Sequence, residues 1–129
     1  MKLSLRSEYA LLSLLTIARN SESGSSSDEV AKSLQVSSET LKDLFTVLLN
    51  AKYLRRSGTK LWLVKPANQI SVEEIIRLFD GAFAPLEPVS EKGYGLAPME
   101  QEQKLTDLFA GIQKQIVHRL ENTTLADLL

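Results

Sequence analysis

Apolar residues recur at three- and four-residue spacing over residues 7–20, which predicts an amphipathic helix with one face on a core. Residues 21–27 are serine, glutamate and glycine, a composition that predicts a mobile polar loop. Ser26 and Glu29 then form a capping-box pair in front of an apolar run. A short second helix is therefore expected over residues 28–34.

A third helix is predicted to begin with Ser37 or Ser38 as its N-cap and to run to about Asn50. Its apolar residues fall on one face, as packing on a core requires. They are Leu41, Leu44, Phe45, Leu48 and Leu49. The second and third helices are separated by a tight turn at residues 35–37, and this order is that of a helix-turn-helix.

Two short runs, residues 52–57 and 60–65, lie on either side of Gly58 and Thr59 and predict a β-hairpin. Pro66 ends the second strand because proline has no amide hydrogen to donate to a sheet. A hairpin that follows a helix-turn-helix is the wing of a winged helix-turn-helix. The order of elements therefore predicts that fold.

A second capping box, Ser71 with Glu74, predicts a fourth helix over residues 72–80 that ends at Gly81. Residues 82–98 contain three prolines and two glycines and show no sustained period. Such a segment is expected to be a linker rather than a helix or strand.

One long helix with a single apolar stripe is predicted from about Met99 to Asn122. The stripe consists of Leu105, Leu108, Phe109, Ile112, Ile116 and Leu120. Thr123 or Thr124 is expected to cap a last short turn. The leucines of that turn are too apolar to be left in water and should pack on the rest of the protein. They are Leu125, Leu128 and Leu129.

The net charge of −1 conceals two halves of opposite sign. Residues 1–65 hold ten Lys or Arg against six Asp or Glu, whereas residues 66–129 hold five against ten. The basic half coincides with the predicted helix-turn-helix and hairpin, which favours a polyanion, double-stranded DNA, as partner. From charge alone, the alternative is a solvated basic face without a partner.

The candidate DNA-binding residues follow from this fold. The second helix of a helix-turn-helix lies in the major groove, a hairpin holds phosphates or reaches the minor groove, and a helix N-terminus adds backbone contacts. The candidates are Lys2, Ser4 and Arg6 before the first helix, Ser38, Glu39, Thr40 and Lys42 in the third, and Arg55, Arg56, Ser57, Thr59 and Lys60 in the hairpin. Two alternatives to DNA contact stay open. Glu39 stabilises the positive N-terminal end of its own helix, and residues 2–6 form a free terminus.

The residue inventory excludes several kinds of chemistry. Cysteine is absent, which excludes disulfides, thiolate catalysis and cysteine-ligated zinc or iron–sulfur sites. The single histidine, His118, has no partner residues at a metal-ligand spacing, so neither a metal site nor a cofactor is predicted. We find no nucleophile beside a base and no glycine-rich phosphate loop, so we do not expect an enzyme. Tyr53 and Trp62 are interpreted as packing residues rather than base-stacking groups.

The sequence resembles the bacterial Rrf-type transcription regulators, a family that includes the iron–sulfur cluster assembly regulator, the nitric-oxide-sensitive repressor and the cysteine-metabolism repressor. The resemblance covers nearly the whole chain. The stretches that carry it are Met1-Lys2-Leu3-Ser4 with Glu8-Tyr9-Ala10-Leu11, Val30-Ala31 with Val36-Ser37 and Leu41, Pro66 followed by Ile70-Ser71-Val72-Glu73-Glu74-Ile75-Ile76 and Asp80-Gly81, and Thr124-Leu125-Ala126-Asp127-Leu128. It implies a homodimer in which the long helices of two subunits cross through the apolar stripe, and a roughly palindromic operator.

The chain departs from the family in two places. Many members place three cysteines after the segment that corresponds to Asp80-Gly81, where they ligate an iron–sulfur cluster that switches DNA binding. This chain has none, so a cluster-free member is expected. The wing, Ser57-Gly58-Thr59-Lys60, is shorter than usual and lacks the family's Arg-Gly and Gly-Gly pair. Insertion of this wing into the minor groove therefore does not follow from the resemblance.

We expect a mainly α protein with a small β-hairpin: a winged helix-turn-helix head at residues 1–81, a linker at 82–98, and a dimerisation helix with its C-terminal turn at 99–129. The expected function is sequence-specific DNA binding by a dimeric repressor in the cytoplasm, with no membrane segment. The alternative is a protein-interaction module or dimerising antagonist that does not bind DNA, favoured by the short wing and by Glu39 and Asp43. A small-molecule effector, if one exists, is expected at the linker, residues 82–98, or in the groove between the head and the long helix.

Overall fold

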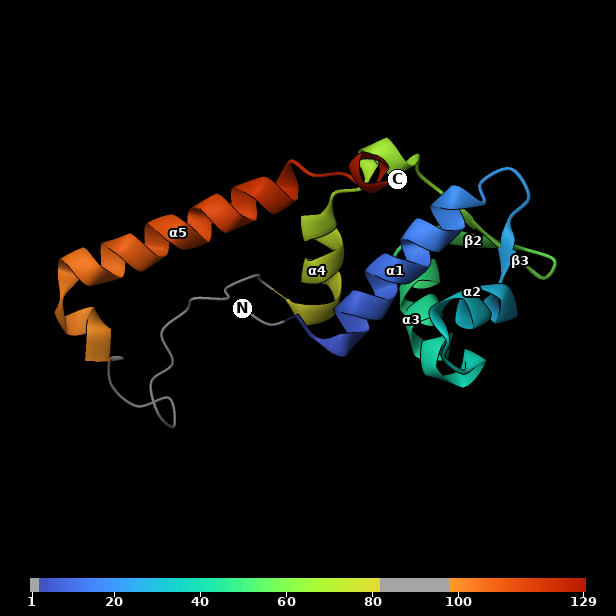
Figure 1. Ribbon diagram of the computed structural model, residues 1–129, viewed down its shortest axis with the longest axis horizontal. Helices are drawn as coiled ribbons and strands as arrows, with labels where there is room; N and C mark the ends of the chain where they lie inside the picture. The colour runs from blue at the N-terminus through green and yellow to red at the C-terminus, as the bar shows by residue number, and fades with distance from the viewer. Residues whose placement is uncertain (1–2, 82–97) are drawn as a thin grey trace.

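The computed structural model describes residues 3–81 and 98–129. Its helices are α1 (Leu5–Arg19), α2 (Ser27–Leu34), α3 (Ser38–Asn50), α4 (Val72–Asp80) and α5 (Gln103–Glu121), and its 3-10 turns are η1 (Ala67–Gln69), η3 (Pro98–Gln101) and η4 (Ala126–Leu128). The strands β1 (Ser25–Ser26), β2 (Leu54–Ser57) and β3 (Lys60–Leu63) form one antiparallel sheet in the order β1-β3-β2. Helices α1–α4 pack with the sheet into a head, and α5 extends away from it (Figure 1). The predicted fold class is confirmed.

Serine side chains begin each of the four helices of the head. The N-caps are Ser4, Ser26, Ser37 and Ser71, and Ser26 and Ser71 complete the predicted capping boxes with Glu29 and Glu74. Helix α1 begins at Leu5 instead of Ser7 because the Ser4 Oγ accepts the Ser7 amide at 3.1 Å. An N-cap bond of this kind satisfies a backbone donor that a helix start otherwise leaves unpaired.

One core joins every element of the head. Helices α1, α2 and α3 contribute most of it, and β2, β3 and α4 close it with apolar side chains. The fully buried larger side chains include Leu14, Ile17, Val30, Leu41, Leu48, Leu54, Leu61, Ile70 and Ile75. Because burial of each such side chain stabilises the fold by about 1.5–3 kcal/mol, this shared core fixes the wing against the helix-turn-helix.

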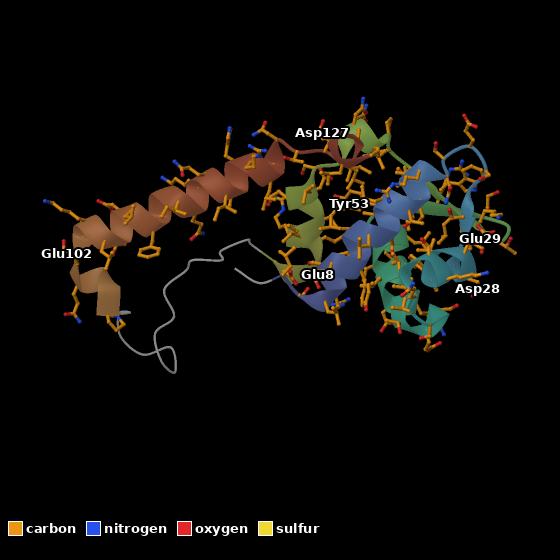
Figure 2. The ribbon with its side chains drawn as sticks, viewed as in Figure 1. Glu8, Asp28, Glu29, Tyr53, Glu102 and Asp127 are labelled. Carbon is orange, nitrogen blue, oxygen red and sulfur yellow. The ribbon has the colours of Figure 1, made fainter. Side chains whose placement is uncertain are left out.

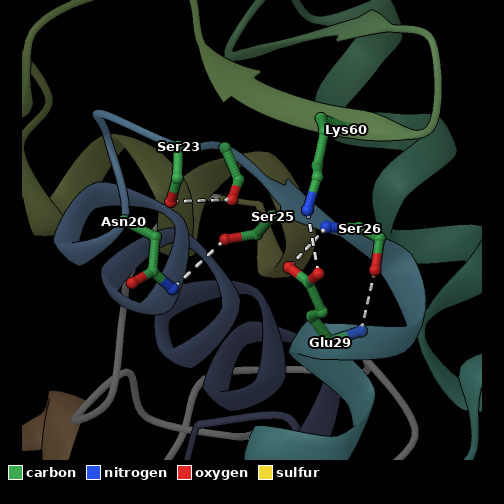
Figure 3. Close-up of polar contacts among 7 residues, drawn as sticks. Asn20, Ser23, Ser25, Ser26, Glu29 and Lys60 are labelled. Atoms are coloured by element: carbon green, nitrogen blue, oxygen red, sulfur yellow. Dashed lines mark hydrogen bonds and ion pairs between the residues drawn. The ribbon is translucent and has the colours of Figure 1, made fainter.

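The mobile loop predicted over residues 21–27 is shorter than expected, since Ser25 and Ser26 form a strand and Ser27 begins α2. Ser25 and Ser26 pair antiparallel with β3, so the sheet has three strands instead of the two of a hairpin. Asn20 holds this segment to α1 by donating from its Nδ2 to the Ser25 Oγ at 3.3 Å (Figure 3). Two serines carry no apolar alternation, so hydrophobic periodicity cannot reveal a strand that forms only by pairing with the edge of β3.

The C-terminal segment returns to the head after α5. The Leu125 amide donates to the Ile70 carbonyl at 2.9 Å, and the Leu125 side chain is fully buried in the core. The expected packing of the terminal leucines is thus confirmed for Leu125. Leu128 and Leu129 remain 48% and 54% exposed. The C-terminal end of α5 is therefore anchored to the head by the segment that follows it.

Helix α5 is shorter than the predicted helix because residues 98–101 form η3 instead. None of its residues is buried, and Figures 1 and 2 show it standing out from the head with its side chains uncovered. The linker predicted at residues 82–98 lies outside the described residues except for Pro98. Within the described ranges, the helices are too short or too polar to cross a membrane.

Tyr53, labelled in Figure 2, ties the start of the wing to α4. Its hydroxyl donates to the Glu74 Oε1 at 2.7 Å. Desolvation and the bond to Glu74 together raise the pKa of Tyr53 from 10.0 to about 12. Burial alone would raise the pKa of Glu74, but hydrogen bonds from Tyr53 and Ser71 outweigh burial and hold that pKa below its ordinary value. The bond therefore favours a neutral phenol and an ionised carboxylate.

We expect Tyr53→Phe to lower the free energy of unfolding by about 1 kcal/mol near neutral pH, the usual effect of removing one partly exposed hydrogen bond. A lowered carboxyl pKa contributes stability above the unfolded value, about 4.3, and that stability disappears as pH falls through the folded value. A raised phenol pKa contributes below pH 10.0 and is lost as pH rises towards about 12.

Urea unfolding of the wild type and of Tyr53→Phe across pH tests this. The difference between them should be largest between about pH 5 and 10 and shrink on both sides. Tyr9→Phe, the same deletion on α1, is the control and should not show this pH profile. A constant difference at every pH would contradict the assignment.

Candidate nucleic-acid interface

The helix-turn-helix is fixed at both ends of its turn. Gln35 ends α2 in the left-handed region, with φ of 58°. The hydroxyl of Ser38, the first residue of α3, donates to the Asp28 carboxylate in the first turn of α2. The start of α3 is therefore held against α2, while its outward side chains are exposed. These are Glu39, Thr40 and Lys42.

A hollow of about 400 Å³ lies between the start of α3 and the wing. It is lined by Ser27, Ser38, Glu39, Lys42, Phe45, Thr46 and Arg56. Lys42 and Arg56 bring two positive charges to it from different elements. A point charge and a guanidinium fork facing one hollow beside an exposed helix start are suited to phosphate oxygens and base edges. We call this surface the α3–wing surface.

The strand register divides the two wing arginines between opposite faces of the sheet. Arg55 pairs with Trp62 and Arg56 pairs with Leu61, and successive residues of a strand point to opposite sides. Arg56 accordingly lines the α3–wing surface. The Arg55 guanidinium instead lies 5.4 Å from the centre of the Trp62 ring, a cation–π contact. The sequence predicts both arginines as DNA ligands but cannot separate them.

Lys60, another predicted phosphate ligand, is engaged within the protein. Its Nζ lies 2.8 Å from the Glu29 Oε1, and the Glu29 Oε2 also accepts the Ser26 amide of the capping box (Figure 3). The hydrogen bond from Lys60 is the largest influence on Glu29, and with the Ser26 amide it holds the pKa of this carboxyl below its ordinary value. Glu29 therefore remains ionised and competes with any phosphate for Lys60.

We expect Glu29→Gln to strengthen DNA binding. A glutamine side chain can still complete the capping box, but it releases Lys60 and removes one negative charge near the DNA. Each additional phosphate contact steepens the salt dependence by about 0.9 and raises affinity roughly three- to tenfold at low salt, so a dimer that gains one contact per subunit should show twice this change in slope. Fluorescence anisotropy with a labelled duplex at several salt concentrations measures both quantities.

Glu22→Gln is the matched control, because it removes the same charge from the same half of the chain outside the capping box. Equal gains in the two variants would show that net charge, and not the release of Lys60, is responsible.

The start of α1, where Arg6 lies instead of before the helix as predicted, contacts α4 and not the α3–wing surface. The Asp80 carboxylate accepts from the Ser4 amide at 3.3 Å and from the Ser7 hydroxyl at 2.7 Å. Burial would raise the Asp80 pKa, but these hydrogen bonds outweigh it and lower that pKa. The Arg6 guanidinium lies 5.4 Å from the centre of the Phe79 ring. Lys2 is outside the described residues.

The structure thus assembles only part of the predicted set. One hollow is lined by Ser38, Glu39, Lys42 and Arg56. Thr40 is exposed beside it, and its hydroxyl lies 2.8 Å from the Ser37 hydroxyl. At the wing turn, Ser57 and Thr59 are exposed. Ser27, Phe45 and Thr46 also line the hollow and were not predicted. Thr46 follows Lys42 by one helical turn, a spacing that could have found it.

Comparison with known proteins finds similarity to transcriptional regulators. The family model Rrf2, described as an iron-dependent transcriptional regulator, matches residues 3–129. A Mycobacterium tuberculosis protein named among the HTH-type transcriptional regulators is 30% identical over 98% of this chain and 80% of its own length. The HTH-type transcriptional regulator IscR of Cereibacter sphaeroides is 27% identical over 100% of this chain and 87% of its own length.

A solved structure shows the same similarity in three dimensions. CymR, the global cysteine regulator of B. subtilis, superposes with a TM-score of 0.78 at 26% identity, over 99% of this chain and 95% of its own. The similarity therefore includes both the head and α5.

Proposed function

The chain belongs to the Rrf2 family of transcriptional regulators, and from this premise we propose that it is a non-catalytic dimeric repressor that binds a palindromic operator through the α3–wing surface. The observation that supports this most directly is the hollow in which Lys42 of α3 and Arg56 of β2 converge. Bacterial promoters lie in the cytoplasm, where we place the protein. Other proposed contacts come from the exposed wing turn and from the start of α1.

Different elements of the α3–wing surface make different kinds of contact with DNA. Arg56 and Lys42 hold phosphates and set the position of α3 in the major groove, because charge-assisted contacts to phosphate give affinity without sequence information. Thr40, exposed on the first turn of α3, reaches base edges or a thymine methyl group. Glu39 accepts from a cytosine amine or stabilises the start of α3. Sequence preference therefore depends on α3, and affinity depends on the two cations.

The uncovered stripe of α5 supports the proposed dimer. Leu105 and Leu108 are 39% and 56% exposed, and no residue of this helix is buried. An apolar stripe along a projecting helix is typical of a surface that another chain covers. A second copy of α5 fits it, because a two-fold dimer matches one stripe with itself. Two heads held in this way suit half-sites one helical turn apart, about 34 Å.

The iron in the family description does not fit the donors of this chain. Cysteine is absent from the whole sequence and histidine occurs once. In the part of the chain that the structure describes, no three His, Asp or Glu side chains come together in a group that could hold a metal ion. No step of the proposed mechanism therefore passes through iron.

The proposal is tested by a gel shift on a random-sequence duplex at low and at moderate salt, followed by selection of bound duplexes and sequencing. We expect salt-sensitive non-specific binding with a Kd of about 10⁻⁴–10⁻⁶ M and enrichment of an inverted repeat. Absence of binding at low salt would favour an antagonist that dimerises without binding DNA. Binding without an enriched repeat would refute the palindromic operator.

A further inference from the structure

A second hollow, of about 510 Å³, lies between the end of α1, Arg55 of β2 and residues 62–67. Its apolar lining includes Ile17 and Ala18 of α1, Leu63 of β3 and Pro66. Arg55 and Trp62 also line it. The volume is within the range of small-molecule sites, about 300–1,000 Å³, and an apolar wall with a few polar groups is their usual composition.

Two polar groups of this hollow, Arg55 and the Trp62 N–H, form no ion pair or hydrogen bond with the described residues. Arg55 is exposed and has no ion-pair partner among residues 3–81 and 98–129. The Trp62 Nε1–H is buried and donates no hydrogen bond to the described residues, although buried donors are normally paired. Lys65, a further cation at the hollow, lies with its Nζ 5.7 Å from the centre of the Tyr53 ring.

The Trp62 indole is held in a fixed position behind Arg55. Gly24 has a φ of +73°, and a Cβ at this position would lie 2.7 Å from the Trp62 Cζ2. Only glycine permits that approach, so the segment that carries β1 closes directly on the ring. The ring face therefore remains a rigid platform for the guanidinium.

From these contacts we infer that this hollow, which we call the Arg55 pocket, binds a small organic carboxylate with an apolar body. The carboxylate accepts charge-assisted hydrogen bonds from the Arg55 guanidinium. The apolar body lies on Ala18, Pro66 and Ala67. A neutral molecule of the same shape would leave the cation without a partner and bind more weakly.

Occupancy of the Arg55 pocket would influence DNA binding. The pocket shares β2 and β3 with the α3–wing surface, because Arg55 and Arg56 are neighbours on opposite faces of β2. A bound carboxylate offsets the positive charge of Arg55, the neighbour of Arg56 in β2, and so weakens the attraction of the wing for phosphate. The ligand is therefore expected to weaken DNA binding, a consequence that rests on the proposed function.

The pocket is tested first without DNA. Trp62 is the only tryptophan of the chain, so its fluorescence reports on this site alone. Titration with 3-phenylpropionate and with octanoate should give a saturable change in emission, and the neutral 3-phenylpropanol should bind at least roughly tenfold more weakly. If neither carboxylate gives a saturable change up to 10 mM, or the alcohol binds equally well, the proposal is overturned.

Three variants then locate the site. Arg55→Gln should weaken binding of 3-phenylpropionate roughly ten- to hundredfold, since it removes a charge-assisted bond, whereas Arg56→Gln on the opposite face should leave this binding unchanged. Ala67→Leu, which fills the hollow without removing a cation, should also weaken it. Equal effects of the two arginine variants would show that the carboxylate responds only to the net charge of the wing.

A last measurement separates this inference from the proposed function. Saturating 3-phenylpropionate should lower the affinity for a labelled duplex in the wild type and not in Arg55→Gln. If the carboxylate binds and DNA does not, the pocket stands and the proposed function fails. If DNA binds and the carboxylate does not, the proposed function stands and the Arg55 pocket is refuted.

Discussion

Arg56→Ala should weaken binding to every duplex by a similar factor, about 50-fold at 0.1 M salt. A two-fold dimer uses each residue twice, so the variant removes two phosphate contacts. Each contact contributes about 0.9 to the slope of log affinity against log salt, and the slope should fall in magnitude by about 1.8. The same loss on operator and random duplexes is expected, because phosphates carry no sequence information. Fluorescence anisotropy across salt concentrations measures the slope directly.

Arg55→Ala is the matched control, since it removes the same charge from the neighbouring position of β2. Its guanidinium lies over Trp62 on the other face of the sheet, so its effect on the slope should be much smaller. An unchanged slope in Arg56→Ala would contradict the phosphate contact. A loss confined to the operator would instead show that Arg56 reads a guanine edge, the commonest specific contact of arginine.

Local chemistry was sufficient to predict the helices of the head. Ser26 with Glu29 and Ser71 with Glu74 form the capping boxes that their spacing predicts, and the side chains involved are at most three residues apart. β1 could not be predicted in this way. Its two serines become a strand only because β3, more than thirty residues later, presents an edge to them.

The sequence predicts which residues are candidates for the site, but it does not predict how they are arranged on the surface. The order of elements predicts Lys42 on the second helix of the helix-turn-helix and Arg56 on the wing. It could not show that strand register turns Arg55 away, or that Glu29 of α2 engages Lys60 across 31 positions of sequence. Both facts depend on tertiary contacts, which leave no local pattern in the sequence.

Ile112→Glu is expected to have the largest effect on function. Ile112 lies in the middle of the α5 stripe, so in a two-fold dimer two carboxylates would enter one apolar interface. Burying an unpaired charge costs several kcal/mol per site, and the chain should become monomeric instead. Analytical ultracentrifugation measures this directly. Because α5 stands apart from the core of the head, the fold of the head should persist, with an unchanged circular dichroism spectrum.

DNA binding should fall with the dimer. Once one head is bound, the second meets its half-site at a millimolar effective concentration, so loss of the link lowers affinity about 10²–10⁴-fold. Ala110→Glu adds the same charge to an exposed position of α5 on the side away from the stripe, about 160° around the helix from Ile112. This control should remain dimeric and bind DNA almost normally. If Ile112→Glu stayed dimeric, the stripe would not be the interface; if it became monomeric with full affinity, one head would suffice.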